Sequence, residues 1–430
     1  MDLTELYRIF RESAGVSTDS RSVKKGELFF ALRGQNYNGN IYVSEAVEKG
    51  ASFAVTDDPA FNKGRTVLVE NTLESLKSLA AHHRKVIGVP VLGITGSNGK
   101  TTTKELIAGI LSKKLKVHYT KGNFNNDIGL PLTILSAPYD TEIMVLEMGA
   151  NHIGEIRALC NIAMPDYGII TNIGTAHIEG FGSFEGVIRA KTELYEYLSL
   201  SGGIAIFNDK NPLLLNKIYS TVNKAVPYSF PSGTELRVEA LPSPMNLKVN
   251  IKYRHFDEEI QTGLFGAYNM ENVKAATAAG LFLGVKIEDI SEALAGYQPG
   301  NNRSQIRITQ RNTLVCDSYN ANPTSMLLSV KSFFNLSSER KVLILGDMLE
   351  LGESSGREHK KIVDELTKLK PEKVILVGKN FIQAAAGSGF LVFEDLNGLT
   401  EYLVSQPISG SHILIKGSRG IALERIYDFL

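Results

Sequence analysis

The chain has 430 residues, of which 43% are hydrophobic and 21% are charged. This length exceeds that of one ordinary core, so we expect two or three domains of a soluble, folded protein. Lys plus Arg and Asp plus Glu both number 46, and this balance excludes a global electrostatic field that would attract nucleic acid or an acidic membrane. Any anionic substrate must therefore be bound by local charges.

Cysteine usage and the first residues of the chain both predict a cytoplasmic protein. Cys160 and Cys316 are the only cysteines, each among apolar neighbours, which excludes a disulfide framework and a cysteine-rich metal site. The N-terminal stretch "MDLTELYRIFRESAGV" carries charges throughout and lacks the apolar core of a signal peptide. No apolar run approaches the length of a transmembrane helix, so we expect no membrane insertion.

Residues 1–87 are expected to form a small α/β domain. Its predicted strands are 26–32, 51–56 and 66–70, and its predicted helices are 40–50 and 72–85.

Residues 88–298 are expected to form a central α/β domain. Apolar, strand-length runs lie at 90–95, 116–120, 141–148, 167–173 and 202–208. Most of them are separated by segments of helix length, which is typical of a parallel, doubly wound sheet. Two later runs, 236–241 and 247–253, alternate with a period of two and could form an antiparallel addition.

Residues 299–430 are expected to form a second α/β domain. Two helical stretches, at 269–285 and up to residue 297, lead to the linker "QPGNNRS". The predicted strands beyond it are 313–318, 341–347, 373–378, 390–395 and 412–418. Because these strands again alternate with helical segments and no repeats occur, we predict three domains.

The stretch "GVPVLGITGSNGKTTTKELIAGIL" predicts a phosphate site, because a strand runs into a glycine loop and then into a helix. Gly96 and Gly99 allow close approach to phosphate, Lys100 can reach the terminal phosphates, and Thr101 can bind Mg²⁺. The strict P-loop spelling fails by one place, since Ile94 stands where the first glycine belongs. The alternative is a glycine turn with a solvated Lys100. Nucleotide binding is favoured, but the reaction type stays open.

Polar residues follow two later strands. Glu147 ends one strand and can hold Mg²⁺ directly or through water. Asn172, Thr175 and His177 follow the next strand, and His177 is either a structural hydrogen bonder or a ligand. Lys191 lies in a helical pattern and, from composition alone, would be a solvated lysine.

Two clusters of asparagine have both a structural and a functional interpretation. Asn125 and Asn126 precede a helix predicted to begin near residue 130, where they could cap the turn or bind a substrate amide. Asn269 and Asn272 stand three apart at a helix start, so both can face one ligand, although capping is the alternative.

The loop "TGSNGKTTT" resembles the ATP loop of the Mur ligase superfamily, the peptidoglycan-precursor amide ligases and their folylpolyglutamate synthetase relatives. The motifs "EMGANHIGEI", "GNFNNDIGLPLTIL", "AHIEGFGS", "DSYNANP", "LGDMLELG" and "LIKGSRG" agree with it, so the resemblance spans essentially the whole chain. It implies a small uridine-nucleotide domain, carried by "STDSRSVKKGELFFALRGQNYNGNIYV", a P-loop-type ATPase domain with a parallel sheet, and a Rossmann-like C-terminal domain.

Within the family, "DSYNANP" is most similar to the branch that joins D-alanyl-D-alanine to UDP-N-acetylmuramoyl-tripeptide. The resemblance implies that ATP activates the tripeptide carboxylate as an acyl phosphate, which the amine of D-Ala-D-Ala then attacks. It also implies two Mg²⁺ ions and carbamylation of Lys191. A monomer is a further expectation, although the sequence does not show the oligomeric state. Whether the tripeptide carries diaminopimelate or lysine is left open.

The resemblance also assigns roles to individual residues. ATP binding falls to Thr95, Gly96, Ser97, Asn98, Gly99, Lys100, Thr101, Thr102, Asn269, Asn272, Arg303 and Asp317. Metal binding falls to Thr101, Glu147, His177 and Lys191, and catalysis to Lys100, His177 and Lys191. Substrate binding falls to Ser20 and Arg21 for the UDP moiety, Asn125 and Asn126 for the acyl substrate, and Tyr319, Asn320, Asn322 and Arg419 for the dipeptide.

The chain departs from the family pattern at two positions. Tyr268 stands where these ligases usually have the histidine of His-Asn-x-x-Asn, and "GNNR" replaces a spelling closer to Gly-Arg before Arg303. The alternatives are the sibling ligase that adds diaminopimelate or lysine, a folylpolyglutamate synthetase, and a P-loop regulatory ATPase or GTPase. The last of these would hydrolyse nucleotide without an acceptor.

Overall fold

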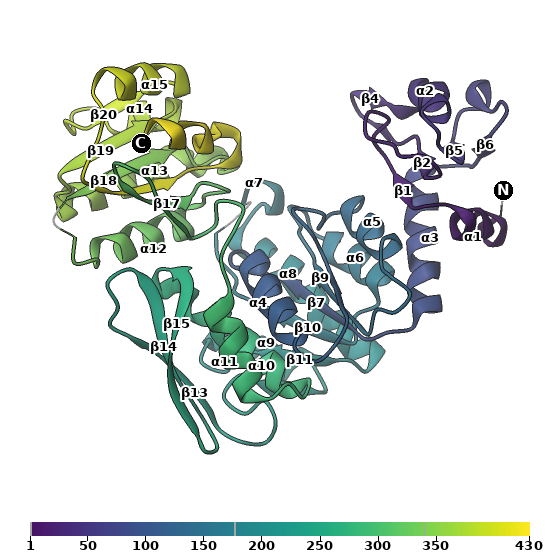
Figure 1. Ribbon diagram of the computed structural model, residues 1–430, viewed down its shortest axis with the longest axis horizontal. Helices are drawn as coiled ribbons and strands as arrows, with labels where there is room; N and C mark the ends of the chain where they lie inside the picture. Colours follow the sequence, from purple (N-terminus) through teal and green to yellow (C-terminus); the bar gives the residue numbers. More distant parts are fainter. Residues whose placement is uncertain (1, 176–177, 339) are drawn as a thin grey trace.

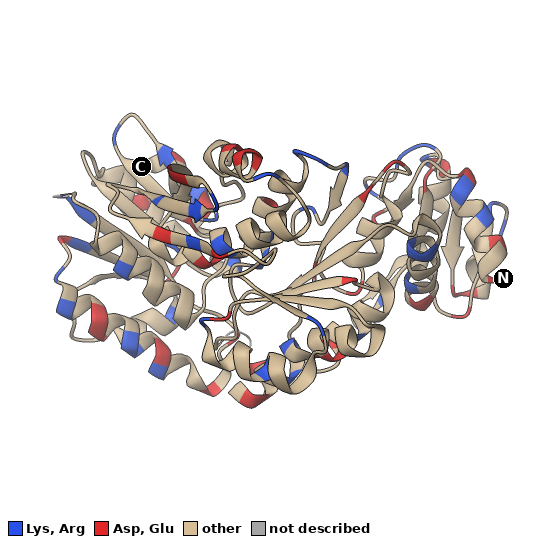
Figure 2. Ribbon diagram, turned by 90° about the horizontal axis from the view of Figure 1, so that it is seen from below, with Lys and Arg blue, Asp and Glu red and all other residues tan. Residues whose placement is uncertain are grey.

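The computed structural model describes residues 2–175, 178–338 and 340–430. Figure 1 shows three units along an open arc, with the N-terminal unit at one end, the central unit in the middle and the C-terminal unit at the other end. The predicted α/β class with parallel sheets is confirmed. Basic and acidic residues are interspersed over all three units (Figure 2), in line with the balanced composition.

The N-terminal unit is built on a parallel sheet of order β1-β2-β5-β6. Its strands are β1 (Val16–Ser17), β2 (Leu28–Phe30), β5 (Phe53–Thr56) and β6 (Thr66–Leu68), with a small hairpin of β3 (Arg33–Gly34) and β4 (Tyr37–Asn38). Its helices are α1 (Leu3–Glu12), α2 (Val43–Glu48) and α3 (Thr72–Ile87), with short 3₁₀ turns η1 (Gly39–Tyr42) and η2 (Pro59–Phe61). Every residue of β2 is buried, as expected of a strand covered on both faces.

Helix α3 connects the N-terminal unit to the central one. Asn71 caps its start by accepting from the Glu74 N–H at 2.9 Å, and Gly88 ends it in a left-handed conformation. Near the end of α3, Arg84 Nε donates to the Ala163 carbonyl at 2.9 Å, which ties the helix to the central unit. One apolar cluster runs from β2 through α3 into the central sheet.

The central sheet is parallel, with the order β12-β11-β10-β7-β9-β8. Its strands are β7 (Val91–Thr95), β8 (Val117–Tyr119), β9 (Ile143–Glu147), β10 (Tyr167–Ile170), β11 (Ile204–Phe207) and β12 (Ala225–Pro227). Its helices are α4 (Lys100–Leu111), α5 (Gly129–Leu135), α6 (Glu155–Ala163), α7 (Ile178–Phe181), α8 (Phe184–Ser201), α9 (Pro212–Thr221), α10 (Met270–Phe282) and α11 (Ile287–Gly296). The edge strand β12 was not predicted as part of this sheet.

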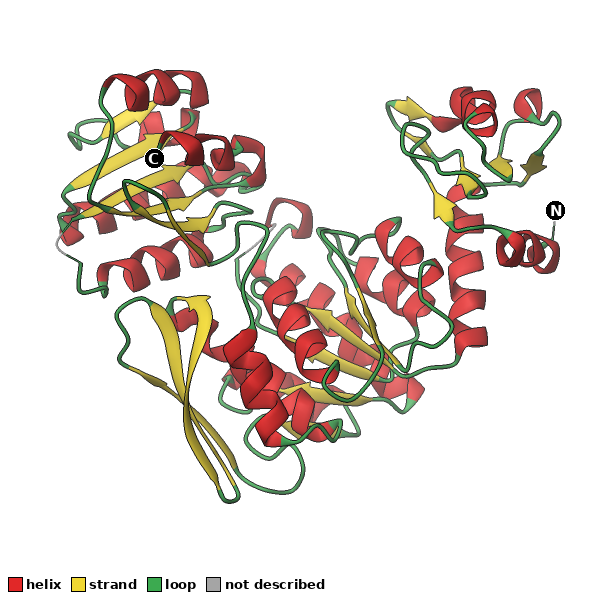
Figure 3. Cartoon of the chain, in the orientation of Figure 1, coloured by secondary structure: helices red, strands yellow, loops and turns green. Residues whose placement is uncertain are grey.

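Helices cover both faces of the central sheet (Figure 3). Met144 and Leu146 of β9 pack in the cluster that contains α5, α6 and α8, whereas Val145 packs in the cluster that contains α4 and α10. Successive side chains of a strand point to opposite faces. The continuous apolar run in this strand therefore serves two cores.

An antiparallel sheet follows the central one, as the alternating pattern suggested. It consists of β13 (Leu236–Leu241), β14 (Asn246–Tyr253) and β15 (Phe256–Phe265). Val249 and Ile251 face inward from β14 and join the apolar cluster that includes α10 and α11. Strand β15 was not predicted; it ends at the short turn η3 (Ala267–Asn269), which leads into α10.

The C-terminal unit has a sheet of order β16-β17-β21-β18-β19-β20, in which only the edge strand β16 is antiparallel. Its strands are β16 (Gln305–Ile308), β17 (Thr313–Asp317), β18 (Lys341–Gly346), β19 (Lys373–Val377), β20 (Leu391–Phe393) and β21 (His412–Lys416). Its helices are α12 (Pro323–Phe334), α13 (Ser355–Leu369), α14 (Lys379–Ala384) and α15 (Leu396–Ser405), with turns η4 (Gly352–Ser354), η5 (Arg419–Ile421) and η6 (Leu423–Phe429).

Among the described helices, none combines the length and the apolar character that crossing a membrane requires.

Candidate active site

A cleft of about 1170 Å³ lies between the central and C-terminal units. Its walls come from the loop before α4, the carboxyl ends of β9 and β10, the start of α10, the linker near Arg303 and the loop after β17. The carboxyl ends of parallel strands are where ligands bind in open α/β sheets. Most residues singled out from the sequence lie around this cleft.

The loop between β7 and α4 can be formed only with glycine at two positions. Gly96 has φ +143° and Gly99 has φ +79°. A Cβ on Gly96 would lie 2.1 Å from Thr171 Oγ1, and one on Gly99 would lie 2.3 Å from Asn272 Oδ1. The backbone therefore passes directly into the N-terminus of α4, where free N–H groups and the helix dipole favour an anion.

Lys100 folds back over this loop instead of extending into solvent. Its Nζ donates to the Gly96 carbonyl at 2.7 Å and to the Ser97 carbonyl at 3.3 Å. Desolvation lowers the pKa of Lys100, the charge of Arg303 lowers it further, and Glu147 opposes the shift. An anion in the loop would offset the repulsion between Lys100 and Arg303.

The loop is held in shape by the segment after β10. The Asn98 N–H donates to Asn172 Oδ1 at 3.0 Å, and Asn172 Nδ2 donates back to the Asn98 carbonyl at 2.9 Å. Thr171 Oγ1 donates to the same carbonyl at 2.6 Å. Asn172 thus supports the loop, and Thr175 follows on the same segment but does not line the cleft. His177, which the sequence assigned to metal binding and catalysis, lies outside the described residues.

Glu147 lies at the carboxyl end of β9 with 1% of its surface exposed. Its Oε2 accepts from Thr101 Oγ1 at 2.8 Å, and its Oε1 accepts from Asn125 Nδ2 at 2.8 Å. Its N–H donates to Thr120 Oγ1 at 2.9 Å. The carboxylate and hydroxyl oxygens of Glu147 and Thr101 are the hard donors that Mg²⁺ prefers, so this pair fits a Mg²⁺ site beside the loop.

Lys191 is buried within α8, with 2% of its surface exposed. Its Nζ donates to the Ala150 carbonyl at 3.1 Å and lies 5.0 Å from the centre of the Phe181 ring. Burial, and then the charge of Lys100, lower the pKa of Lys191 to about 7. A large share of the amine is therefore uncharged near neutral pH. The sequence pattern alone suggested a solvated lysine, and the structure excludes that interpretation.

Asn269 and Asn272 line the cleft, but their side chains mainly bind each other and the protein. Asn272 Nδ2 donates to Asn269 Oδ1 at 2.7 Å, while Asn272 Oδ1 accepts from Thr103 Oγ1 at 3.1 Å. Asn269 Nδ2 donates to the Phe265 carbonyl at 2.7 Å. None of these three contacts caps α10, whose N-cap residue makes no side-chain cap hydrogen bond. The pair connects the phosphate-loop helix to the end of β15.

Arg303 reaches the cleft from the linker. Its guanidinium carbon lies 3.5 Å from the centre of the Tyr319 ring, which is a close stacking contact. Arg419, which the sequence assigned to the dipeptide, lies 5.8 Å from the same ring and pairs with Glu424 at 2.9 Å. Both arginines therefore approach the Tyr319 ring, but only Arg303 lines the cleft.

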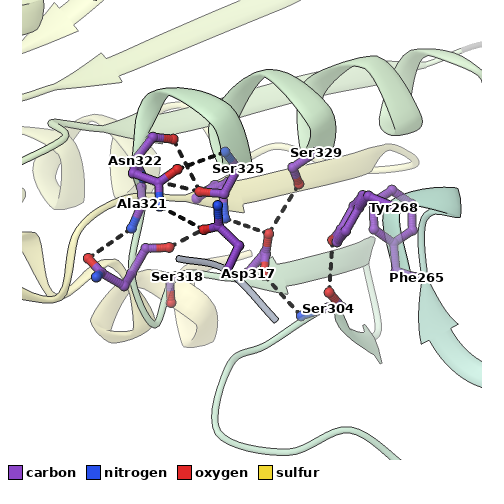
Figure 4. Close-up of polar contacts among 12 residues, drawn as sticks. Phe265, Tyr268, Ser304, Asp317, Ser318, Ala321, Asn322, Ser325 and Ser329 are labelled. Atoms are coloured by element: carbon purple, nitrogen blue, oxygen red, sulfur yellow. Dashed lines mark hydrogen bonds and ion pairs between the residues drawn. The ribbon is translucent and has the colours of Figure 1, made fainter. Parts of the chain in front are cut away.

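Asp317 ends β17 and is held by a buried ion pair. Lys416 Nζ lies 2.7 Å from Asp317 Oδ2, and 9% of Asp317 and 3% of Lys416 are exposed. The Ser304 N–H donates to Asp317 Oδ1 at 3.0 Å, and Ser329 Oγ donates to Oδ2 at 3.2 Å (Figure 4). Asp317 lies at the cleft wall, but most of its oxygen positions are already used.

The loop after β17 joins the C-terminal unit to the phosphate loop. Asn322 caps α12 by accepting from the Ser325 N–H at 2.9 Å (Figure 4). Its Nδ2 donates to Asn98 Oδ1 at 2.7 Å. A second contact between the units joins the Thr175 and Thr324 hydroxyls at 3.2 Å. Asn320 also lines the cleft.

Three other predicted residues have clear structural partners. Ser20 is buried and its carbonyl accepts from Lys49 Nζ at 3.0 Å, whereas Arg21 is exposed and pairs with Asp19 at 2.8 Å. These two lie in the N-terminal unit and do not line the cleft. Asn126 lines the cleft and accepts from the Gly129 N–H at 2.8 Å at the start of α5.

Some polar partners of the site were not predicted. Thr103, Ser304 and Lys416 each bind a residue that the sequence had singled out. Of these three, only Lys416 could have been recognised from the sequence. It ends a buried strand of a parallel sheet, and ligands bind at that edge of such sheets.

The fold and the cleft define a class of protein, in which three α/β units are joined in series and the central one presents a glycine loop to a cleft shared with the third. Comparison with known families agrees with that class. Residues 94–280 match the family described as Mur ligase middle domain, residues 302–419 match Mur ligase, glutamate ligase domain, and residues 12–93 match Mur ligase family, catalytic domain. The chain belongs to the Mur ligase family.

Similar proteins extend over nearly the whole chain. UDP-N-acetylmuramoyl-tripeptide–D-alanyl-D-alanine ligase of Bacillus subtilis (strain 168) is 35% identical over 426 residues, which cover 96% of this chain and 92% of the relative. MurF from Acinetobacter baumannii superposes with a TM-score of 0.87 at 29% identity and covers 99% of this chain and 97% of its own. MurF ligase from Thermotoga maritima in complex with ADP gives 0.84 at 27% identity, with 98% and 97% coverage.

Proposed function

We propose that this protein is an ATP-dependent ligase that joins D-alanyl-D-alanine to UDP-N-acetylmuramoyl-tripeptide in peptidoglycan precursor synthesis. The observation that carries the proposal is the cleft itself, in which Lys100, the Thr101–Glu147 pair and the loop after β17 meet. Its support from outside the chain is the similarity to proteins of that name over at least nine-tenths of both sequences.

The chemical problem is that an amine does not attack a carboxylate, because the carboxylate is a poor electrophile and oxide is a poor leaving group. ATP solves it by transferring its terminal phosphoryl group to the tripeptide carboxylate, which gives an acyl phosphate and ADP. The amine of the dipeptide then attacks the acyl carbon, phosphate leaves, and the amine loses a proton. Both steps balance without a further reactant.

The phosphate loop serves the first step. The N–H groups at the start of α4 and the Lys100 ammonium, already desolvated and placed over the loop, would bind the terminal phosphates and stabilise charge that develops during transfer. We assign the other loop residues, Thr95 to Thr102, to the same phosphates. Asn269, Asn272, Arg303 and Asp317 would complete the nucleotide site.

Thr101 and Glu147 would hold the Mg²⁺ that accompanies ATP. When bound, Mg²⁺ supplies positive charge that offsets the charge of the phosphate oxygens. Lys191 fits carbamylation, because a buried amine with a pKa of about 7 is roughly half uncharged near pH 7, and the uncharged form reacts with CO₂. The carbamate would give an anionic oxygen donor for a second Mg²⁺, together with His177.

The remaining assignments concern the two substrates. Ser20 and Arg21 would meet the UDP moiety, and Asn125 and Asn126 would meet the acyl chain. The dipeptide would be held by the loop after β17 and the segment after β21, through Tyr319, Asn320, Asn322 and Arg419. Three further properties remain predictions. They are the domain boundaries at 87/88 and 298/299, the cytoplasmic location and the monomeric state.

The test is an incubation of the full chain with ATP, Mg²⁺, UDP-N-acetylmuramoyl-tripeptide and D-Ala-D-Ala, with phosphate release and the ligated product measured together. We expect phosphate release only when both substrates are present, and loss of both signals in Lys100→Ala. Exchange of D-Ala-D-Ala for diaminopimelate or lysine, with the matching UDP-dipeptide, tests the sibling activity. Phosphate release without either substrate would contradict the proposal and support a regulatory NTPase.

A further inference from the structure

The linker that carries Arg303 has an unusual backbone. Asn301 and Asn302 both have φ +56°, and Ser304 has φ +49°. Asparagine tolerates this left-handed region, whereas serine is disfavoured there. A non-glycine residue persists in such a conformation only where its surroundings determine it. The segment on both sides of Arg303 is therefore set by contacts, and not by the preference of its own backbone.

Ser304 provides those contacts. Its hydroxyl lies 2.8 Å from the Tyr268 hydroxyl and accepts from Asn269 Nδ2 at 3.1 Å. Its N–H donates to Asp317 Oδ1 at 3.0 Å. Figure 4 shows the Tyr268 side chain pointing at Ser304 from the turn after β15, with Asp317 on the opposite side. Only 4% of Ser304 is exposed.

These three contacts come from both sides of the linker. Tyr268 and Asn269 belong to η3 of the central unit, and Asp317 ends β17 of the C-terminal unit. The Tyr268 ring packs with Phe265, with ring centres 6.3 Å apart and nearly perpendicular. The Tyr268 ring is thus held by packing against Phe265, which restricts the position of its hydroxyl.

The residue that this arrangement places is Arg303. Its neighbours on both sides have left-handed backbones, so its direction depends on where Ser304 is held. The side chain lies on the Tyr319 ring at 3.5 Å and lines the cleft. Its Nε is buried and has no hydrogen-bond partner in the described part of the chain. Arg303 therefore lies at the cleft with its Nε–H available to donate to a ligand.

We propose that Ser304, held by the Tyr268 hydroxyl, is a positioning residue that fixes Arg303 toward the terminal phosphate of the nucleotide. This inference rests on the proposed function, since it takes ATP as the ligand. It adds Ser304 and Tyr268 to the residues on which the reaction depends, although neither has to touch ATP. It also gives Tyr268 a role that depends on its hydroxyl.

The first test separates turnover from substrate affinity. Tyr268→Phe removes only the hydroxyl, and Ser304→Gly removes the hydroxyl while permitting the left-handed backbone. We expect each variant to lower kcat about 10- to 100-fold, because a displacement of a catalytic group by about 1 Å can reduce the rate this much. The KM for D-Ala-D-Ala should change much less. An unchanged kcat in both variants overturns the proposal.

The second test is a double-mutant cycle with Arg303→Ala. If Ser304 acts through Arg303, adding Ser304→Gly to Arg303→Ala should cause no further loss of kcat. A merely structural role would multiply the two losses, and this result would also overturn the proposal. Tyr253→Phe is the matched control. Tyr253 ends the strand β14, which is remote from the linker, and its hydroxyl is hydrogen-bonded to Ser232. Its kcat should equal that of the wild type.

A binding measurement keeps the inference testable without turnover. Arg303→Ala and Ser304→Gly should each weaken binding of a non-hydrolysable ATP analogue with Mg²⁺ more than binding of ADP, and their effects should not add. If the wild type binds the analogue but does not ligate, the proposed function fails while this result still stands. Equal weakening of both nucleotides contradicts the positioning role.

Discussion

The side-chain amide of Asn322 donates to the side-chain oxygen of Asn98 at 2.7 Å, and this contact joins the C-terminal unit to the tip of the phosphate loop. Asn322 also caps α12, so one side chain contacts both the start of this helix and the phosphate loop. The two units therefore meet at the place where the nucleotide phosphates would lie. Nucleotide binding and the position of the C-terminal unit are expected to be coupled through it.

Asn322→Ser separates the two contacts, because serine can still cap α12 but is too short to reach Asn98. We expect the thermal stability to stay close to that of the wild type, since the cap is worth about 1 kcal/mol and is kept. Amide hydrogen exchange in residues 96–99 should become faster, because the loop loses a neutral hydrogen bond of roughly 0.5–1.5 kcal/mol. Exchange in the loop that matches the wild type would show that Asn322 does not hold it.

Lys191→Ala should reduce turnover strongly if the buried amine is carbamylated. The variant leaves space beside the middle of α8, so a small carboxylic acid added to the assay should restore part of the activity by replacing the anionic oxygen. Lys191→Arg is the matched control, because it is cationic, fills the space and should not be rescued. Unchanged turnover in Lys191→Ala would falsify the assignment.

Two glycines of the same region should respond in opposite ways to alanine. Gly99→Ala forces a Cβ to 2.3 Å from Asn272 Oδ1 at a residue with φ +79°, so we expect loss of nucleotide binding and a lower melting temperature. Gly109→Ala, in the last turn of α4, meets nothing within 4 Å. It should raise stability by about 0.5–1 kcal/mol through helix propensity and reduced unfolded-state entropy. Calorimetry and ADP titration measure both effects.

We expect His83 to make the attachment of α1 to α3 dependent on pH. It is buried, accepts from or donates to the Tyr7 hydroxyl at 3.1 Å, and packs edge-on to Phe10. Burial, and then the charges of Arg11 and His82, lower the pKa of His83 to about 4. Between pH 6.5 and 4 the unfolded state binds this proton and the folded state does not, so stability falls as pH falls through that range.

The expected slope is at most about 1.4 kcal/mol per pH unit for one proton. Urea unfolding of the wild type and of His83→Gln at pH 7.5, 6 and 5 isolates the contribution of His83 to this slope, because glutamine does not titrate. The free energy of unfolding should decline less with falling pH in the variant. Parallel curves for the two proteins would show that His83 does not supply the dependence.

Much of the fold followed from periodicity. The buried runs that became β7, β9, β10 and β11 were identified because strands covered on both faces are continuously apolar. Strand β16 was missed because its short sequence "QIRI" places arginine at the edge of a sheet, where one side faces solvent. Local pattern cannot distinguish such a strand from a polar loop, since its partner β17 supplies the hydrogen bonds.

The site shows the same limit. The spacing of Asn269 and Asn272 predicted that they lie together, but not that Thr103, distant in sequence by 169 positions, takes the free oxygen of Asn272. Lys191 could not be recognised as buried from its helical pattern, because burial depends on which helices and strands pack against α8. Strand ends and glycine loops are local features, whereas the partners of a buried polar group are set by the tertiary fold.

The Asp317–Lys416 pair gives a final prediction on stability. Both side chains are largely buried and their charged atoms lie 2.7 Å apart. Removing one partner leaves the other charge buried, which costs about 3–5 kcal/mol, whereas replacing both by uncharged groups of similar size is often close to neutral. Asp317→Asn should therefore destabilise the C-terminal unit more than the double variant Asp317→Asn/Lys416→Met. Both variants should lose nucleotide affinity if Asp317 has the proposed role in ATP binding, because both remove its carboxylate. If the double variant were the less stable of the two, the ion pair would not be the reason for the loss.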